Sequence, residues 1–419
     1  MERRKYSSRQ LLGALVLAAA ATAAAGECPA GVQSAAAAVA ALHGAGSLPV
    51  RCETVAADEL AARLRERLEA STGVPLATEL EVAWRLGLTG GRRPAEIEEP
   101  LLRLLASQVL GYYDPARDTM VLVEGGGGAL PGMDQLVWFH EAEHAYQEHR
   151  YGLGSRLLAL RGNTDAQLAA SAVAEGDAVL VMAALAIAEE RPTPEELADG
   201  AEAILDALGA AGGSLGGGDV PAAFVEQVLF PYREGTRFVA AALRAGGWSA
   251  VGRLLESPPA STEQILHPER RNDAPETIAD GDLPVVPGYD TVVVDTSGEW
   301  ALGTWLGLAL PREEALRAAE GWDGDRYRLA RSTERPELWR LDLLSRWDTP
   351  GDAEEAAAAF EAALPRLLVL GPGPAAVTVR VEGRSVTVTA AGTAPDAPAA
   401  GRSAVPSSPA GPSDAPRGR

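Results

Sequence analysis

His140-Glu141-Ala142-Glu143-His144 is the stretch of sequence on which the interpretation of the whole chain depends. Residues four apart project from the same face of an α-helix, so the two imidazoles can bind one metal ion. Zinc accepts neutral imidazole nitrogen, and catalytic zinc sites combine three protein ligands with one open position. Glu141 lies beside that position, where a carboxylate can take a proton from a zinc-bound water and later pass it to a leaving amine. The stretch therefore predicts a zinc (Zn²⁺) centre with hydrolytic chemistry.

The composition of the chain makes this pattern rare. The 419 residues include five histidines and 58 acidic residues. Composition alone gives roughly 0.008 expected occurrences of two histidines four apart with an acid after the first. A lone histidine is more often a core or surface residue, so the inference rests on the pair together with Glu141.

The residues around the pair predict a helix over 134–150. Asp134 can cap its start, and Gly152 or Gly154 can end it. The β-prone run Thr119–Val123 comes before this helix. Such a run can be an ordinary core strand, or an edge strand against which an extended substrate pairs. In this order of elements the sequence resembles the zincin metallopeptidases, in which an edge strand precedes the active-site helix.

The third metal ligand is sought among the histidine and acidic residues that follow the pair, namely His149, Asp165, Glu175 and Asp177. His149 comes five residues after His144, which rotates it by about 140° on a continuous helix. The metzincin pattern requires a third histidine six residues after the second, and Arg150 stands there instead. We therefore expect His149 to face solvent.

Glu175 is the preferred third ligand. A second long helix is predicted from Asp165 to about residue 190, and Glu175 falls on its apolar stripe. A carboxylate buried there is costly unless a cation or a donor compensates it. Asp177 points about 160° away on a regular helix, and Asp165 is expected to cap the helix start.

Two histidines on one helix and a glutamate on a following helix is the arrangement of the gluzincins. Further segments are similar to those of a family of exported bacterial proteins that carry a gluzincin-like motif; these are residues 174–178, 230–232, 261–269 and 321–327. The resemblance spans roughly residues 95–365. It implies a secreted zinc peptidase that binds the metal through His140, His144 and Glu175. The step from His144 to Glu175 is longer than in the best-known gluzincins.

Zinc peptidases usually add a donor that stabilises the developing oxyanion. His267, in a loop beside Pro268, is the first candidate for this role, and Tyr232 and Tyr113 are alternatives. Asp177 could instead orient a zinc histidine through its second nitrogen, although its place on the helical wheel argues against this.

The pattern of elements predicts an α+β fold that is predominantly helical. We expect a zincin-like catalytic domain over 28–283, a smaller α+β unit over 284–392, and a disordered Pro/Ala/Ser-rich tail over 393–419. Residues 1–27 have the basic start, apolar run and small residues of a cleaved signal peptide.

The signal peptide predicts a protein that is secreted, periplasmic or held at the cell surface. The cysteines at 28 and 52 can pair in an oxidising compartment. Lipid anchoring at Cys28 is disfavoured, because Glu27 stands where lipoprotein signals place a small residue. No membrane span is expected once the signal is removed. The net charge of −21 repels phosphate backbones and argues against nucleic-acid partners.

The leading hypothesis is therefore a secreted zinc metallopeptidase that acts on a peptide or protein substrate. One alternative is a zinc hydrolase that cuts another amide or an ester. A second is a secreted zinc-binding or scaffold protein without turnover, against which Glu141 argues, because a structural zinc site gains nothing from a base. Neither the cleavage specificity nor the oligomeric state follows from the sequence.

Overall fold

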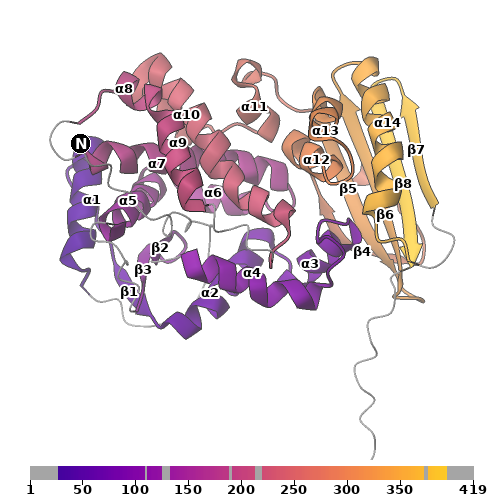
Figure 1. Ribbon diagram of the computed structural model, residues 1–419, viewed down its shortest axis with the longest axis horizontal. Coiled ribbons are helices and arrows are strands. Elements are labelled where there is room, and N and C mark those ends of the chain that lie inside the picture. Colours follow the sequence, from indigo (N-terminus) through magenta and orange to yellow (C-terminus); the bar gives the residue numbers. More distant parts are fainter. Residues whose placement is uncertain are drawn as a thin grey trace, which may run out of the picture.

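The computed structural model describes residues 27–108, 111–124, 133–187, 191–212, 219–371 and 376–393. The fold is α+β and mostly helical. A helical part with a small three-stranded sheet precedes a five-stranded sheet, which lies at one end of the molecule (Figure 1). The predicted signal peptide at 1–27 and the predicted tail at 393–419 lie, apart from their innermost residues, outside the described residues.

The helical part contains eleven helices and three strands within the described ranges. Its helices are α1 (Ala30–Leu42), α2 (Ala57–Thr72), α3 (Leu76–Arg85), α4 (Pro94–Gln108), α5 (Met133–Tyr151), α6 (Leu153–Ala159), α7 (Thr164–Ala186), α8 (Pro194–Asp199), α9 (Ala201–Gly212), α10 (Ala222–Glu256) and α11 (Thr262–Leu266). Its strands are β1 (Cys52–Val55), β2 (Gly111–Asp114) and β3 (Thr119–Val123). The short 3₁₀ turns η1 (Pro268–Arg270) and η2 (Asp280–Asp282) lead to the second part.

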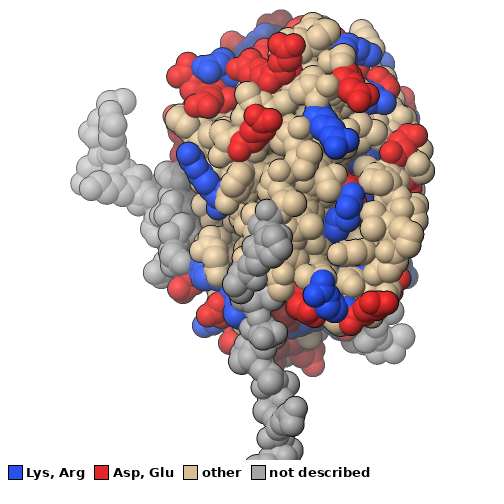
Figure 2. Space-filling view, turned by 90° about the vertical axis from the view of Figure 1, so that its right-hand side faces the viewer, with Lys and Arg blue, Asp and Glu red and all other residues tan. Residues whose placement is uncertain are grey.

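The C-terminal part contains β4 (Tyr289–Asp295), α12 (Gly298–Leu306), α13 (Arg312–Ala319), β5 (Trp322–Ser332), β6 (Leu338–Trp347), α14 (Pro350–Leu367), β7 (Ala376–Glu382) and β8 (Ser385–Thr393). The five strands are antiparallel in the order β4-β5-β6-β8-β7. Trp322, Trp339, Trp347 and Phe360 are fully buried in the core shared by this sheet and its helices. On the end of the molecule shown in Figure 2, charged side chains of both signs are scattered among uncharged ones and form no patch of one sign.

Helix α7 lies at the centre of the helical part. It is the one helix within the described ranges that is long and apolar enough to cross a bilayer, yet 83% of its apolar stretch is buried in the protein. We therefore interpret it as a core helix. Gly176 allows α10 to approach closely, since a Cβ there would lie 2.3 Å from the Gly235 carbonyl carbon. This close crossing fixes the position of the neighbouring Glu175.

The strand order corrects the expected edge strand. Thr119–Val123 forms β3, the central strand of the small sheet, with β2 antiparallel on one side and β1 parallel on the other. The sequence missed β1 because four residues are too few for a period to be recognised. The edge strand of this sheet nearest α5 is β2. All four residues of β2 are buried, so β2 does not offer an open edge to a substrate strand.

Two helix predictions also need correction. The alternation of strand-like and helical runs after residue 284 predicts one helix over 302–319, but the structure has two helices there, α12 and α13, and Pro311 is the N-cap residue of the second. The N-cap of α7 is Asn163, whose side chain accepts a hydrogen bond from the Ala166 amide. Asp165 instead lies buried in the first turn, where its carboxylate accepts hydrogen bonds from Thr262.

Candidate metal centre

His140 and His144 lie one turn apart on α5, and Glu175 faces them from α7. Nε2 of His140 is 3.1 Å from Nε2 of His144 and 3.1 Å from Oε2 of Glu175. Nε2 of His144 is 3.4 Å from the same carboxylate oxygen. The structure thus brings together the three residues that the sequence predicted as ligands, and they form a cluster able to hold a metal ion.

These distances fit the donor geometry of one zinc ion. Zinc–nitrogen and zinc–oxygen bonds of about 2.0–2.1 Å in a tetrahedron place the ligand atoms roughly 3.3 Å apart. All three separations in the cluster lie near this value. Two imidazole nitrogens and one carboxylate are also a donor set that occurs in catalytic zinc sites. The residues present therefore fit a divalent ion such as zinc.

The electrostatics of the cluster favour a positive charge at the point where the three side chains meet. Burial alone lowers the pKa of His144, but the carboxylates of Glu175 and Glu141 outweigh burial and raise that pKa to about 9. Burial raises the pKa of Glu175, yet His144 and His140 outweigh it and hold the pKa at about 2. Glu175 is therefore a carboxylate, whose charge suits a cation.

Glu141 lies next to the cluster and is 1% exposed. Its Oε2 accepts a hydrogen bond of 2.8 Å from the backbone amide of Tyr113, in β2. Burial raises the pKa of Glu141, and the two imidazoles oppose this shift. The small sheet thus orients a carboxylate of increased basicity beside the two histidines, as a general base requires.

Gln147 determines which nitrogen of His144 faces the cluster. The Gln147 amide nitrogen donates to the carbonyl oxygen of Ala174, 3.0 Å away, so its Oε1 must be the atom 2.9 Å from Nδ1 of His144. Nδ1 therefore carries the proton, and Nε2 offers its lone pair to a metal. No local pattern in the sequence indicates this role for Gln147, because the role depends on contacts with α7.

Behind Gln147 lies a buried acidic pair. The Gln147 amide nitrogen also donates to Oδ2 of Asp177 at 2.9 Å. Glu143 lies beside Asp177, and Oε2 of Glu143 is 2.8 Å from Nε2 of His43. Burial raises the pKa of Glu143 to about 8 and that of Asp177 well above its usual value, an effect that Glu143 strengthens. Asp177 thus supports a zinc-motif histidine, but through Gln147 rather than directly.

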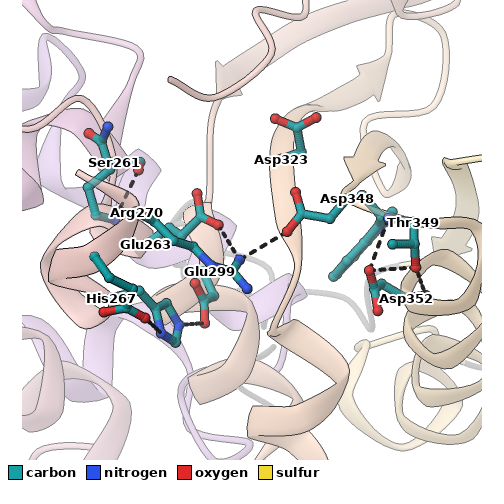
Figure 3. A network of polar contacts seen from close by, with 12 residues as sticks. Ser261, Glu263, His267, Arg270, Glu299, Asp323, Asp348, Thr349 and Asp352 are labelled. Atoms are coloured by element: carbon teal, nitrogen blue, oxygen red, sulfur yellow. Dashed lines mark hydrogen bonds and ion pairs between the residues drawn. The ribbon is translucent and has the colours of Figure 1, made fainter. Parts of the chain in front are cut away.

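The other predicted donors lie in different places. Tyr232 is buried, and its ring is stacked 6.1 Å from that of His140. The hydroxyl of Tyr113 donates to Asp118, which also pairs with the exposed His149. His267 contacts Glu299, with Nε2 and Oε1 2.9 Å apart, at the junction drawn in Figure 3.

Neither Tyr113 nor His267 belongs to the cluster of His140, His144 and Glu175. Of the three proposed oxyanion donors, Tyr232 is the one whose ring lies near and roughly parallel to that of a cluster histidine, with 6.1 Å between the centroids of the Tyr232 and His140 rings.

Comparison with known proteins gives one match to a family. Residues 287–400 match a domain of unknown function, DUF8575. This range covers the C-terminal sheet from β4 to β8 and lies outside the metal cluster. No curated protein and no solved structure matches the chain. The matched part of the chain is therefore similar to a domain to which no activity is attached.

Proposed function

We propose that this protein is an exported zinc metallopeptidase with a zincin-like catalytic core. The observation that carries the proposal is the convergence of His140, His144 and Glu175 at separations of 3.1 to 3.4 Å. The peptide as substrate is inferred from the sequence resemblance to gluzincin-like exported proteins. Export is supported by the Cys28–Cys52 disulfide, a bond typical of oxidising compartments.

The side chains of the site suit amide hydrolysis. A zinc ion held by the three ligands would supply Lewis acidity to a water molecule and to the scissile carbonyl. Glu141 is placed to accept a proton from the attacking water and to deliver it to the leaving amine nitrogen. The water oxygen first forms a C–O bond to the carbonyl carbon, which places negative charge on the carbonyl oxygen. The amide C–N bond then breaks as the nitrogen receives its proton, which leaves a carboxylate and an amine. Tyr232 is the proposed donor to the oxyanion, because it is buried near the cluster with its ring centroid 6.1 Å from that of His140.

The same arrangement argues against a purely structural zinc site. Structural sites are usually closed by a fourth protein ligand, whereas this cluster within the described residues has three. A buried carboxylate with a raised pKa beside it, Glu141, is what hydrolysis needs and a structural site does not.

The test combines metal analysis with a peptide-library digest on the mature chain. We expect about one zinc per wild-type chain and cleavage of library peptides. Glu141→Gln should retain the metal and lose activity by at least a hundredfold, whereas Glu175→Ala should lose the metal. The control is Glu99→Gln, since Glu99 is exposed on α4. A Glu141→Gln variant that cleaves as well as wild type would refute the mechanism.

A further inference from the structure

A large cavity adjoins the metal centre. Its volume is about 600 Å³, within the range of roughly 300–1,000 Å³ that is typical of ligand sites. It reaches the metal centre through Glu175 and Tyr232, and it reaches the C-terminal sheet through Tyr327, Leu341 and Leu343. Both parts of the molecule therefore contribute walls to one space that is continuous with the candidate active site.

The walls of the cavity are mainly apolar. Phe224 and Val228 of α10, Val293 of β4 and Trp300 of α12 all line it, and each of these side chains is only half-buried. Large apolar side chains that remain partly uncovered inside a protein forgo the free energy of full burial. Such surface marks a site for an apolar ligand.

Several polar side chains on the walls are already hydrogen-bonded within the protein. Gln167 donates to the carbonyl oxygens of Ser71 and Leu157, both at 3.1 Å. The hydroxyl and amide of Thr164 donate to Asp295. The donors of Gln167 and Thr164 are therefore already used in hydrogen bonds within the protein. Glu79 also lines the cavity, and its buried Oε1 has no hydrogen-bond partner among the described residues. The walls are otherwise mainly apolar, so they match few of the polar groups of a ligand that carries many.

This distinction identifies the occupant. A peptide backbone carries one donor and one acceptor per residue, and leaving them unpaired in an apolar cavity is costly. An unbranched hydrocarbon chain carries none. We infer that the substrate of the metal centre is an acylated peptide whose long hydrocarbon chain lies in this cavity. The inference rests on the proposed function for the identity of the bond that is cut. The binding of the hydrocarbon chain depends on the cavity alone.

The first experiment measures chain-length dependence on the zinc-loaded mature protein. One library-selected peptide is prepared with acetyl, octanoyl, dodecanoyl and hexadecanoyl groups, and kcat/KM is measured for each. We expect kcat/KM to rise by up to about fourfold for each added methylene until the cavity is full, since burying a methylene contributes roughly this factor.

Variants with the same substitution test the location. Val228→Phe and Val293→Phe fill the cavity from opposite parts of the molecule, and each should abolish the chain-length dependence while cleavage of the acetylated peptide continues. The control is Val381→Phe, because Val381 is exposed on the edge strand β7, and this variant should behave as wild type. Two cavity variants that both fold and both retain the full dependence would overturn the inference.

A binding measurement separates this inference from the proposed function. Octanoate, dodecanoate and hexadecanoate are titrated calorimetrically into the Glu141→Gln protein, which needs no turnover. Affinity that increases with chain length, and that falls in the two cavity variants, supports the acyl site even if no peptide is ever cleaved. Peptide cleavage whose kcat/KM does not depend on chain length, together with fatty-acid affinities that do not depend on chain length, overturns the acyl site and leaves the peptidase standing.

Discussion

At the scale of single residues, Gln147 is the contact that holds His144 in the tautomer a metal needs. Gln147→Leu keeps much of the side-chain volume but removes the acceptor for Nδ1. We predict that zinc affinity falls by about 10- to 100-fold, as expected for the loss of a group that orients a metal ligand. The measurement is a competition titration with a chelator of known affinity.

The matched control for this prediction is Gln135→Leu, more than three turns earlier on the same helix. It should leave zinc affinity unchanged. Gln147→Glu, which restores an acceptor, should recover part of the loss. Equal zinc affinities in wild type and Gln147→Leu would show that His144 needs no such support.

The metal-ligand residues could be predicted from the sequence, whereas the residues that position them could not. His140 and His144 follow from their spacing, which depends only on helical geometry. The apolar-stripe argument for Glu175 is weaker than expected, because α7 is buried on all its faces and Asp177 is as buried as Glu175. The roles of Gln147 and Glu143 depend on which part of α7 faces α5. That packing is set by the tertiary structure, and no local pattern in the sequence encodes it.

At the scale of elements, the crossing of α7 and α10 holds Glu175 in place. A methyl group at Gly176 would lie 2.3 Å from the carbonyl carbon of Gly235, so Gly176→Ala must push the two helices apart. We predict a loss of about 1–3 kcal/mol in the free energy of unfolding together with weaker zinc binding. Gly46→Ala meets no atom within 4 Å and should change neither. Unaltered denaturation and zinc titration curves for Gly176→Ala would refute the role of this crossing.

Most helices and strands could be predicted from the sequence, but which of them pair or pack together could not. Helix α5 has the bounds that its turn residues predict, and the alternating apolar residues over 377–388 predict the hairpin of β7 and β8. Helix α7 has buried residues on all its faces, so its length rather than a period indicates a helix. The central position of β3 did not, because it depends on β1, which comes some 60 residues earlier in the chain. Helix α1 was also missed, since its alanine-rich sequence carries little periodic contrast.

The disulfide fastens the start of α1 to β1. Cys28 and Cys52 are 24 residues apart in sequence, and closing a loop of that length stabilises a fold by about 3–4 kcal/mol in the chain-entropy account. We predict that Cys52→Ser lowers the free energy of unfolding in urea by about this amount. Cys28→Ser and the double variant should show the same loss, because all three lack the same bond. A double variant markedly less stable than either single one would mean that the two cysteines act separately.

At the scale of the whole molecule, buried and partly buried polar contacts join the helical part to the C-terminal part. Arg270 bridges Glu263 at 2.8 Å and Asp348 at 3.0 Å, as Figure 3 shows. Nearby, Thr262 of α11 donates to Asp165 of α7 and accepts from the Trp300 amide of α12. The walls of the cavity come from both parts, so these contacts also maintain its shape.

Asp165 makes this junction sensitive to pH. Burial raises the pKa of the Asp165 carboxyl to about 8, whereas an aspartate in the unfolded chain titrates near 4. Between these values the folded protein holds a proton that the unfolded chain has released. The contribution of Asp165 to the free energy of unfolding is therefore greatest below pH 4. This contribution is lost as the pH rises toward 8, by at most about 1.4 kcal/mol per pH unit.

Asp165→Asn isolates this effect, because the amide oxygen can still accept from Thr262 while the group no longer titrates. We predict that the fall in unfolding free energy between pH 5 and pH 8, measured by urea denaturation, is smaller in Asp165→Asn than in wild type. Asp290→Asn, at an exposed position on β4, should reproduce the wild-type slope. If Asp165→Asn and wild type lose the same unfolding free energy over this range, Asp165 does not carry the proton at the junction. The pH dependence must then come from other buried carboxyls such as Glu263, because burial raises the pKa of Glu263 to about 7.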